Sequence, residues 1–142
     1  MFSFETGTEG WASANWQSNA GTVAQSADFA TNGAYSLQVD TADGGWFGHV
    51  FGSPVDLTGR TNLKFDLQTT TAGTSQNVAI QAGDSWEWCQ GPWGWVNPGT
   101  TTTTDLDLLS TSCTAPDLSK IQAIYVWFSG GGTFYMDTVR AE

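Results

Sequence analysis

The chain has 142 residues, with 14 Asp and Glu against 4 Lys and Arg and a formal net charge of −10. Nucleic acids and anionic membranes both attract clusters of Lys and Arg, so this charge balance excludes them as partners. No apolar stretch approaches the roughly 18 residues of a membrane-spanning helix. The first residues lack the basic and apolar regions of a signal peptide, as expected of a mature or excised domain. The length suits one domain over residues 1–142.

Short segments in which apolar and polar residues alternate recur along the chain and are predicted to be half-buried strands. In chain order they are residues 36–40, 62–68, 78–82, 102–108 and 122–128. Glycine pairs and an Asn-Pro-Gly sequence separate them, as expected of turns. Residues 117–121 are the one helix-like segment and are too short to form a layer. The pattern predicts an all-β protein, an antiparallel β-sandwich (jelly roll).

Cys89 and Cys113 are the only cysteines, and His49 is the only histidine. This set cannot assemble a structural zinc site or a Cys-x-x-Cys redox motif. A disulfide is predicted, which would stabilise the fold by roughly 3 kcal/mol and place the protein outside the cytosol. The alternative is two unpaired thiols that pack as small apolar side chains. His49 is expected at the surface or in a loop.

The chain has 8 Trp, 8 Phe and 3 Tyr, which is more aromatic area than one small sandwich core needs. In residues 122–128, Ile, Val and Phe alternate toward the core, which leaves Tyr125 and Trp127 on the opposite face. Residues 85–95 are predicted to form two extended arms around a Gly-Pro turn, each with a Trp-x-Trp pair. Trp46 adds another aromatic residue at a loop or strand start.

Trp residues outside a core suggest a sugar-binding surface, because the C–H face of a pyranose stacks on indole and its hydroxyls need amide or carboxylate partners. For any single Trp the alternative is core packing, but several exposed together favour aggregation unless they bind something. Amides of Gln38, Gln90 and Asn97 are also near these segments. The predicted carbohydrate-binding residues are Trp46, Gln81, Trp86, Glu87, Trp88, Trp93, Trp95, Tyr125 and Trp127.

No motif of a catalytic serine, a zinc hydrolase or a phosphate-binding loop occurs. A glycosidase needs only two suitably spaced carboxylates, which the 14 acidic residues could supply. For Glu87, which lies between two Trp, hydrogen bonding to sugar or solvent is favoured over catalysis. We therefore predict a non-catalytic protein.

Four segments together resemble a known family: residues 4–11, 33–39, 55–59 and 134–140. In order and spacing they are similar to β-jelly-roll carbohydrate-binding modules, which are appended to secreted bacterial glycoside hydrolases that act on mannan, xylan and β-glucan. The resemblance covers both ends of the chain and leaves out the Trp-rich residues 86–95.

The resemblance implies a structural calcium ion where the first and last strands meet. Glu5 and Asp137 would supply carboxylates, and the turn at Asn32 would supply a backbone or side-chain oxygen. Oxygen ligands of this kind suit Ca²⁺. By the same resemblance Trp11 belongs to the core, and the protein is secreted, extracellular and monomeric, with a covalently linked catalytic domain.

The functional hypothesis is a module that holds a parent hydrolase on β-1,4-linked plant polysaccharide. Mannan or glucomannan is the first candidate ligand, and cellulose-type β-glucan or xylan is the next. One alternative is a small extracellular jelly-roll glycoside hydrolase or lyase, which would release reducing ends. Another is a lectin-like adhesion domain, which would prefer terminal sugars to internal chains.

Overall fold

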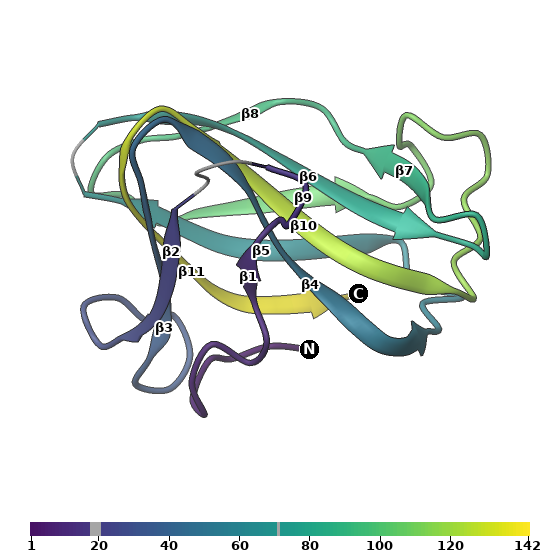
Figure 1. The fold of residues 1–142 in the computed structure, drawn as a ribbon, viewed down its shortest axis with the longest axis horizontal. Helices are drawn as coiled ribbons and strands as arrows, with labels where there is room; N and C mark the ends of the chain where they lie inside the picture. Colours follow the sequence, from purple (N-terminus) through teal and green to yellow (C-terminus); the bar gives the residue numbers. More distant parts are fainter. Residues whose placement is uncertain (18–20, 71) are drawn as a thin grey trace.

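Residues 1–17, 21–70 and 72–142 are described by a computed structural model, in which two antiparallel sheets face each other (Figure 1). The six-stranded sheet has the order β1 (Ala12–Ser13), β4 (Gly44–Val55), β10 (Ile121–Ser129), β6 (Thr74–Ala82) and β7 (Glu87–Gln90), with β8 (Gly94–Val96) also paired to β6. The five-stranded sheet has the order β2 (Thr22–Ser26), β3 (Ser36–Thr41), β11 (Gly132–Ala141), β5 (Asn62–Thr69) and β9 (Thr102–Asp107). The predicted all-β antiparallel sandwich is confirmed. In the described ranges, no helix has the length and apolar character needed to cross a membrane.

The two sheets pack through apolar side chains that alternate along the facing strands. Leu63 and Phe65 of β5 are fully buried, as are Ile124 and Phe128 of β10, in agreement with the predicted alternation. Phe128 stacks on Phe134 of β11 with ring centroids 4.6 Å apart, so one aromatic pair joins the two sheets. Because Ile124, Val126 and Phe128 occupy the inner face of β10, Tyr125 and Trp127, which alternate with them, lie on its outer face.

The prediction that residues 85–95 form two arms around a turn is wrong. β7 and β8 both pair antiparallel with β6, so the chain passes Gly91 and Pro92 without reversing direction. The Gly91 N–H donates to the carbonyl of Val78 (2.9 Å), and the Asn77 amide donates to the Gly91 carbonyl (2.9 Å). β6 is long enough to pair with the two short strands one after the other, which a Gly-Pro signal alone does not reveal.

The predicted disulfide between Cys89 and Cys113 is present. Cys89 is fully buried in β7, and Cys113 belongs to the long connection between β9 and β10. The bond therefore ties the Trp-rich edge of the six-stranded sheet to this connection, before Asp117, as expected. The connection ends in a turn in which the Lys120 N–H donates to the Asp117 carbonyl (3.1 Å).

His49 lies within strand β4 and is half-buried, so the expectation of a surface or loop position is wrong. Its ring packs against Phe2 and Phe51, each with centroids 4.8 Å away. Burial lowers the pKa of His49 below its usual value. The ring is thus part of an aromatic contact that fastens the N-terminal residues to β4.

Candidate functional site

The outer face of the six-stranded sheet carries a continuous group of aromatic side chains. Tyr125 and Trp127 of β10 lie there, opposite Gly48 and Trp46 of β4 in the strand register. On the other side of β10, Ala79 and Asn77 of β6 are their partners. The prediction that Tyr125 and Trp127 lie on the face opposite the core is confirmed, and both residues share this face with Trp46.

Trp88 of β7 is at the centre of this group. Its ring centroid is 4.8 Å from that of Trp46 at an interplanar angle of 87°, and 5.7 Å from that of Trp16 at 88°. Tyr125 lies 5.3 Å from Trp88 and 4.9 Å from Trp16. Except for the tilted Trp88–Tyr125 pair, these contacts are edge-to-face, which is favourable for aromatic pairs, so the rings hold one another in a fixed arrangement. We call Trp16, Trp46, Trp88 and Tyr125 the aromatic cluster.

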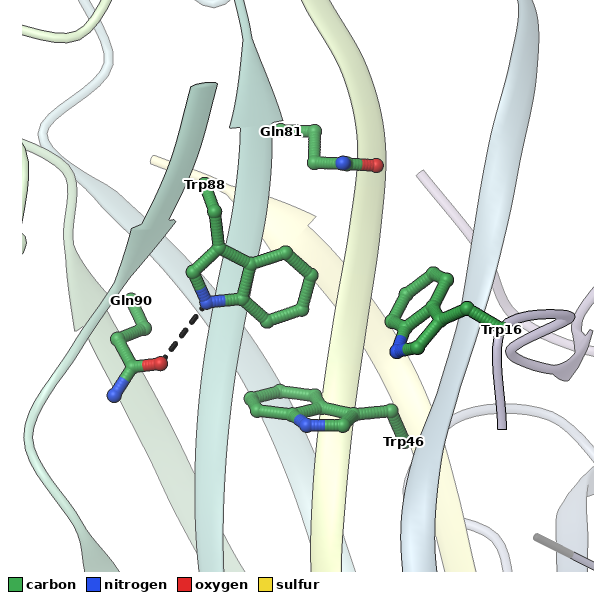
Figure 2. Close-up of a pocket in the computed structure, with 5 residues that line it drawn as sticks. All are labelled: Trp16, Trp46, Gln81, Trp88 and Gln90. Atoms are coloured by element: carbon green, nitrogen blue, oxygen red, sulfur yellow. Dashed lines mark hydrogen bonds between the residues drawn. The ribbon is translucent and has the colours of Figure 1, made fainter. Parts of the chain in front are cut away.

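Three of these rings enclose a pocket of about 260 Å³ (Figure 2). The residues that line it, among those the structure describes, are Trp16, Trp46, Gln81, Trp88 and Gln90. Figure 2 shows the indoles on different sides of the space and the two amides along its border. None of these five side chains is charged, so the pocket is apolar with amide groups at its edge.

Both amides are oriented by neighbouring aromatic residues. The indole N–H of Trp88 donates to Gln90 Oε1 (2.9 Å), and the Tyr125 hydroxyl donates to Gln81 Oε1 (3.0 Å). The oxygens of the two amides are therefore engaged, and their NH₂ groups can donate to a ligand. Hydroxyl oxygens are the matching acceptors, so the pocket combines stacking surfaces with donors for hydroxyl groups.

Tyr125 supports the pocket from below. Only 3% of its surface is exposed, and burial raises the pKa of its hydroxyl above the usual value. The ring lies directly over Gly48, where a Cβ atom would collide with it. A glycine at this position of β4 is thus needed for Tyr125 to lie flat on the sheet.

Trp16 was not predicted from any sequence pattern; it follows the short strand β1 and is 52% exposed. Its loop is fastened to the backbone of Trp46 on both sides. The Ala14 N–H and the Gln17 amide both donate to the Trp46 carbonyl (2.9 Å each), and the Trp46 N–H donates to Gln17 Oε1 (3.0 Å). Trp16 is positioned by these long-range bonds, which strand periodicity cannot predict.

Other predicted residues lie outside the pocket. Trp127 lies beside it, with its ring centroid 5.7 Å from that of Trp46. Trp95 is 56% exposed on β8, covers Gly73 and donates its indole N–H to Asn97 (3.2 Å).

Trp86 and Trp93 are 42% and 59% exposed, and both precede short strands rather than belonging to them. Gln38 belongs to the five-stranded sheet and bonds to Asp40 there.

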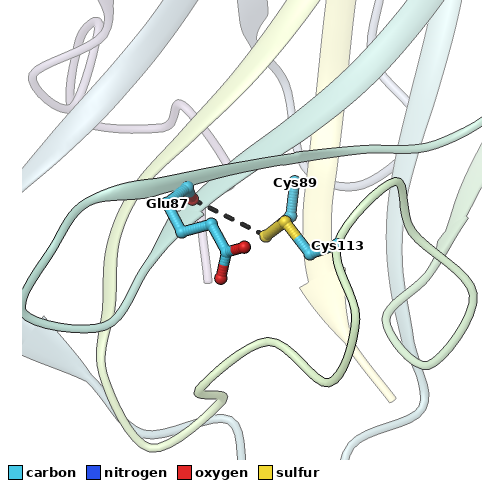
Figure 3. Close-up of side chains that lie close together, drawn as sticks. All are labelled: Glu87, Cys89 and Cys113. Atoms are coloured by element: carbon cyan, nitrogen blue, oxygen red, sulfur yellow. Dashed lines mark hydrogen bonds between the residues drawn. A yellow bond between two sulfur atoms is a disulfide. The ribbon is translucent and has the colours of Figure 1, made fainter.

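Glu87 also lies away from the pocket, although it is next to Trp88 in sequence. In β7 it pairs with Ala82, whose side chain faces the core, whereas Trp88 pairs with outward-facing Gln81. Figure 3 shows its carboxylate beside the sulfurs of Cys89 and Cys113. These sulfurs form the disulfide and are not thiolate ligands, so the three residues do not constitute a metal site.

The three residues implied as calcium ligands meet at one loop. Glu5 Oε1 accepts the N–H groups of Ala34 and Tyr35 (3.0 and 2.9 Å). Asp137, which is fully buried, accepts the N–H of Asn32 at Oδ2 (2.9 Å). The carboxylates of Glu5 and Asp137 suit a hard cation. Asn32, however, contacts Asp137 through its backbone N–H, which is a hydrogen-bond donor and not a metal ligand. The N–H groups bound to the two carboxylates also offset part of their negative charge. Calcium binding therefore stays a prediction.

A glycine in this loop and the predicted core position of Trp11 complete the description. Gly33 packs against the Glu5 carboxylate so closely that a Cβ atom would collide with it, and its φ of +82° also favours glycine. Trp11 is 2% exposed and belongs to the core, as expected.

The β-sandwich is the fold implied by the resemblance of the four sequence segments to jelly-roll carbohydrate-binding modules. The comparisons support this class. The family described as "Mannanase, galactose-binding domain-like" matches residues 2–138, and the chain belongs to this family. No curated protein matches the chain.

Several solved structures share the fold. A family 11 carbohydrate-binding module from Clostridium thermocellum, in complex with a β-1,3-1,4-mixed-linked tetrasaccharide, has a TM-score of 0.78 at 11% identity, over 99% of this chain and 93% of that one. A module specific for non-crystalline cellulose has a TM-score of 0.72 at 17% identity, over 99% of this chain and 92% of the other. An exo-β-agarase has a TM-score of 0.74 at 13% identity, but this chain, matched in full, covers 24% of it. At these identities the likeness concerns the fold alone.

Proposed function

We propose that this protein binds an uncharged β-linked polysaccharide through the aromatic cluster. The observation that carries the proposal is the pocket of three indoles and two oriented amides. An indole face removes the apolar C–H surface of a sugar ring from water, while the amide NH₂ groups donate to its hydroxyls. The family to which the chain belongs and the modules that share its fold support the same class of ligand.

The charge of the site supports a neutral sugar. The five described residues that line the pocket include no cation to pair with a uronic acid. A formal net charge of −10 also repels polyanionic chains at low ionic strength. Mannan and glucomannan are the first candidates, since the family is named for mannanases, and cellulose-type β-glucan and xylan are the next.

The ring geometry supports binding of separate chains over binding to a flat crystal face. A flat platform needs coplanar rings, whereas Trp88 is nearly perpendicular to both Trp46 and Trp16. Rings at right angles border a sugar unit on several sides. A single polysaccharide chain can enter such a pocket, but a chain packed in a crystal surface exposes only one side.

The biological role that we propose is targeting: the module holds a covalently linked glycoside hydrolase close to its substrate. The coverage of only 24% of the exo-β-agarase illustrates that this fold occurs within longer chains. The disulfide supports an extracellular location. We further propose that Ca²⁺ binds near Glu5 and Asp137 and stabilises the module without taking part in sugar binding.

A hydrolase or lyase activity at this pocket is not favoured. Glycoside hydrolysis uses two carboxylates on either side of the scissile bond, and no carboxylate belongs to the described lining of the pocket. Glu87 faces the disulfide on the other side of β7. Incubation with soluble mannan, glucomannan, β-glucan and xylan should therefore release no reducing ends, and release that depends on Glu87 would contradict the proposal.

The binding test is affinity electrophoresis followed by titration calorimetry with the same four polysaccharides. Trp88→Ala should weaken binding at least tenfold, since one aromatic platform contributes about 1 to 3 kcal/mol in related stacking sites. Trp93→Ala is the matched control, because it removes an exposed indole outside the pocket and should have a smaller effect. Equal binding by Trp88→Ala and the unchanged protein, both shown to be folded, would refute the proposed site.

A further inference from the structure

A second pocket of about 210 Å³ lies next to the first on the same face of the sheet. Trp16 lines both pockets, and Tyr125, which supports the first pocket through Gln81, lines the second. The second pocket lies over the β1 edge, where Ala12 is paired with Gly48 in the register. The Trp16 ring thus forms a wall between the two spaces.

Together the two pockets have the volume of one ligand site. Sites for small organic ligands usually have volumes of at least about 300 Å³. Neither pocket reaches this value alone, but the two together exceed it. We propose that they are two subsites of one groove, and that the second subsite binds a further ring of the same uncharged sugar chain past Trp16. This inference rests on the proposed function.

The chemistry of the second pocket suits a sugar ring that binds less tightly than the first. Tyr125, which lies flat over Gly48, forms an aromatic side of the pocket, and Val50, 53% exposed, supplies further apolar surface. Asn15 and Ser13 provide polar groups at its border. Its described lining, like that of the first pocket, contains no charged side chain, so both subsites select for a neutral ligand.

The loop that carries Trp16 keeps the two subsites in a fixed relation. Bonds from Ala14 and Gln17 to the Trp46 backbone hold the loop on either side of Trp16. Trp46 lines the first pocket and Ala14 the second. Because this arrangement exists before binding, the protein loses little conformational freedom when a polysaccharide chain binds across both subsites.

The test uses oligosaccharides of two and of six units made of mannose, glucose or xylose, from whichever polymer binds most tightly. Ala12→Ile adds a β-branched, uncharged side chain at an exposed position of the second pocket. It should weaken binding of the six-unit ligand at least fivefold and change binding of the two-unit ligand less than twofold. Asn15→Ala, in the exposed loop, should weaken the six-unit ligand in the same selective way. Ala24→Ile in strand β2 is the matched control and should change neither affinity.

The outcomes separate this inference from the proposed function. If Trp88→Ala abolishes binding while Ala12→Ile and Asn15→Ala both leave six-unit affinity unchanged, the second subsite is refuted and the first pocket stands. If the unchanged protein binds none of the oligosaccharides, both proposals fail. Melting curves of each variant establish that a loss of affinity does not come from unfolding.

Discussion

The two outer faces of the sandwich lie over the same core but differ sharply in chemistry. On the six-stranded sheet, the aromatic cluster is bordered by amides and carries no charge among its pocket-lining residues. On the five-stranded sheet, the outward residues include Asp40, Asp66, Asp105 and Asp137. Both faces contact water, so the difference does not follow from the demands of core packing.

The acidic face satisfies its polar groups internally. Asp66 accepts a hydrogen bond from Arg140 (3.1 Å), a second from the Thr31 hydroxyl (3.0 Å) and a third from Thr103 (2.7 Å). Asp137 accepts bonds from the backbone of the loop at Thr31. Side chains paired in this way need no polysaccharide to satisfy their hydrogen bonds.

The aromatic face is different, because its hydrogen bonds orient side chains without covering them. Trp88 donates its indole N–H to Gln90, yet the ring still borders an open pocket. A ligand that covers exposed apolar surface of this kind removes it from water, which is favourable for binding. One face of the sandwich therefore contributes to stability, and the other is available for binding.

The sharpest contrast is expected between two neighbours on β10. Trp127→Ala should weaken polysaccharide binding about fivefold, less than Trp88→Ala, because the indole lies beside the pocket against Trp46. It should leave the melting temperature nearly unchanged, because the indole lies outside the core. Phe128→Ala should destabilise the fold by about 3 to 5 kcal/mol, because the ring is 1% exposed and stacks on Phe134. Thermal melting and calorimetry on both variants check this. Unfolding of Trp127→Ala would show that the outer face also supports the fold.

The alternation of apolar and polar residues correctly predicted which side chains of β10 face the core, so this part of the fold follows from local sequence. Alternation identified β3, β5 and β10 because each has one face against the core, which forces a period of two. The Trp-rich edge was harder, since the pairing of β7 and β8 depends on the length of β6. A Gly-Pro pair suggests a turn but does not show which strand the flanking residues pair with.

The candidate site was predictable only in part for the same reason. Trp46, Gln81 and Trp88 were identified and do line one pocket. Trp16 was missed, because bonds from Gln17 to a strand 29 residues away position it. Glu87 was included because it lies between two Trp in sequence, although alternation along β7 turns it to the other side.

The second largest effect is expected on the acidic face. Asp137→Ala should lower the free energy of unfolding by about 3 kcal/mol, because the N–H groups of Thr31 and Asn32 lose a buried acceptor. Asp105→Ala, at an exposed position of the same sheet, is the control and should cost about 0.5 kcal/mol or less. Denaturant titration measures both values. Polysaccharide affinity should be the same in both variants, and a loss of affinity in Asp137→Ala that is still folded would break the division between the faces.

A smaller stabilisation is expected from calcium. If Ca²⁺ binds only the folded protein, a concentration of 100 times its dissociation constant adds about 2.7 kcal/mol. We expect the melting temperature of metal-free protein to rise on addition of Ca²⁺ and to fall again with chelator. Glu5→Gln keeps the shape of the side chain but removes its charge, and should reduce the response. An unchanged melting temperature would indicate that the hydrogen bonds from Ala34 and Tyr35 are sufficient without a metal.

The smallest effect is expected from salt and pH on binding, because the described pocket lining has no charged or readily titrating side chain. Affinity should stay constant between about 0.05 and 0.5 M NaCl, where screening would weaken a site built on charges. The titrating group of the aromatic cluster is Tyr125, and burial raises the pKa of its hydroxyl above 10.0. Since the raised pKa belongs to the folded state, the stability from the neutral hydroxyl is fully present below pH 10 and is lost as the pH rises through the folded pKa.

Calorimetry at pH 5, 7 and 9 should therefore give equal affinities, and a decline appears only where deprotonation removes the donor to Gln81. An affinity that falls between pH 5 and 7 would place a carboxylate or His49 in contact with the sugar and so overturn the uncharged site.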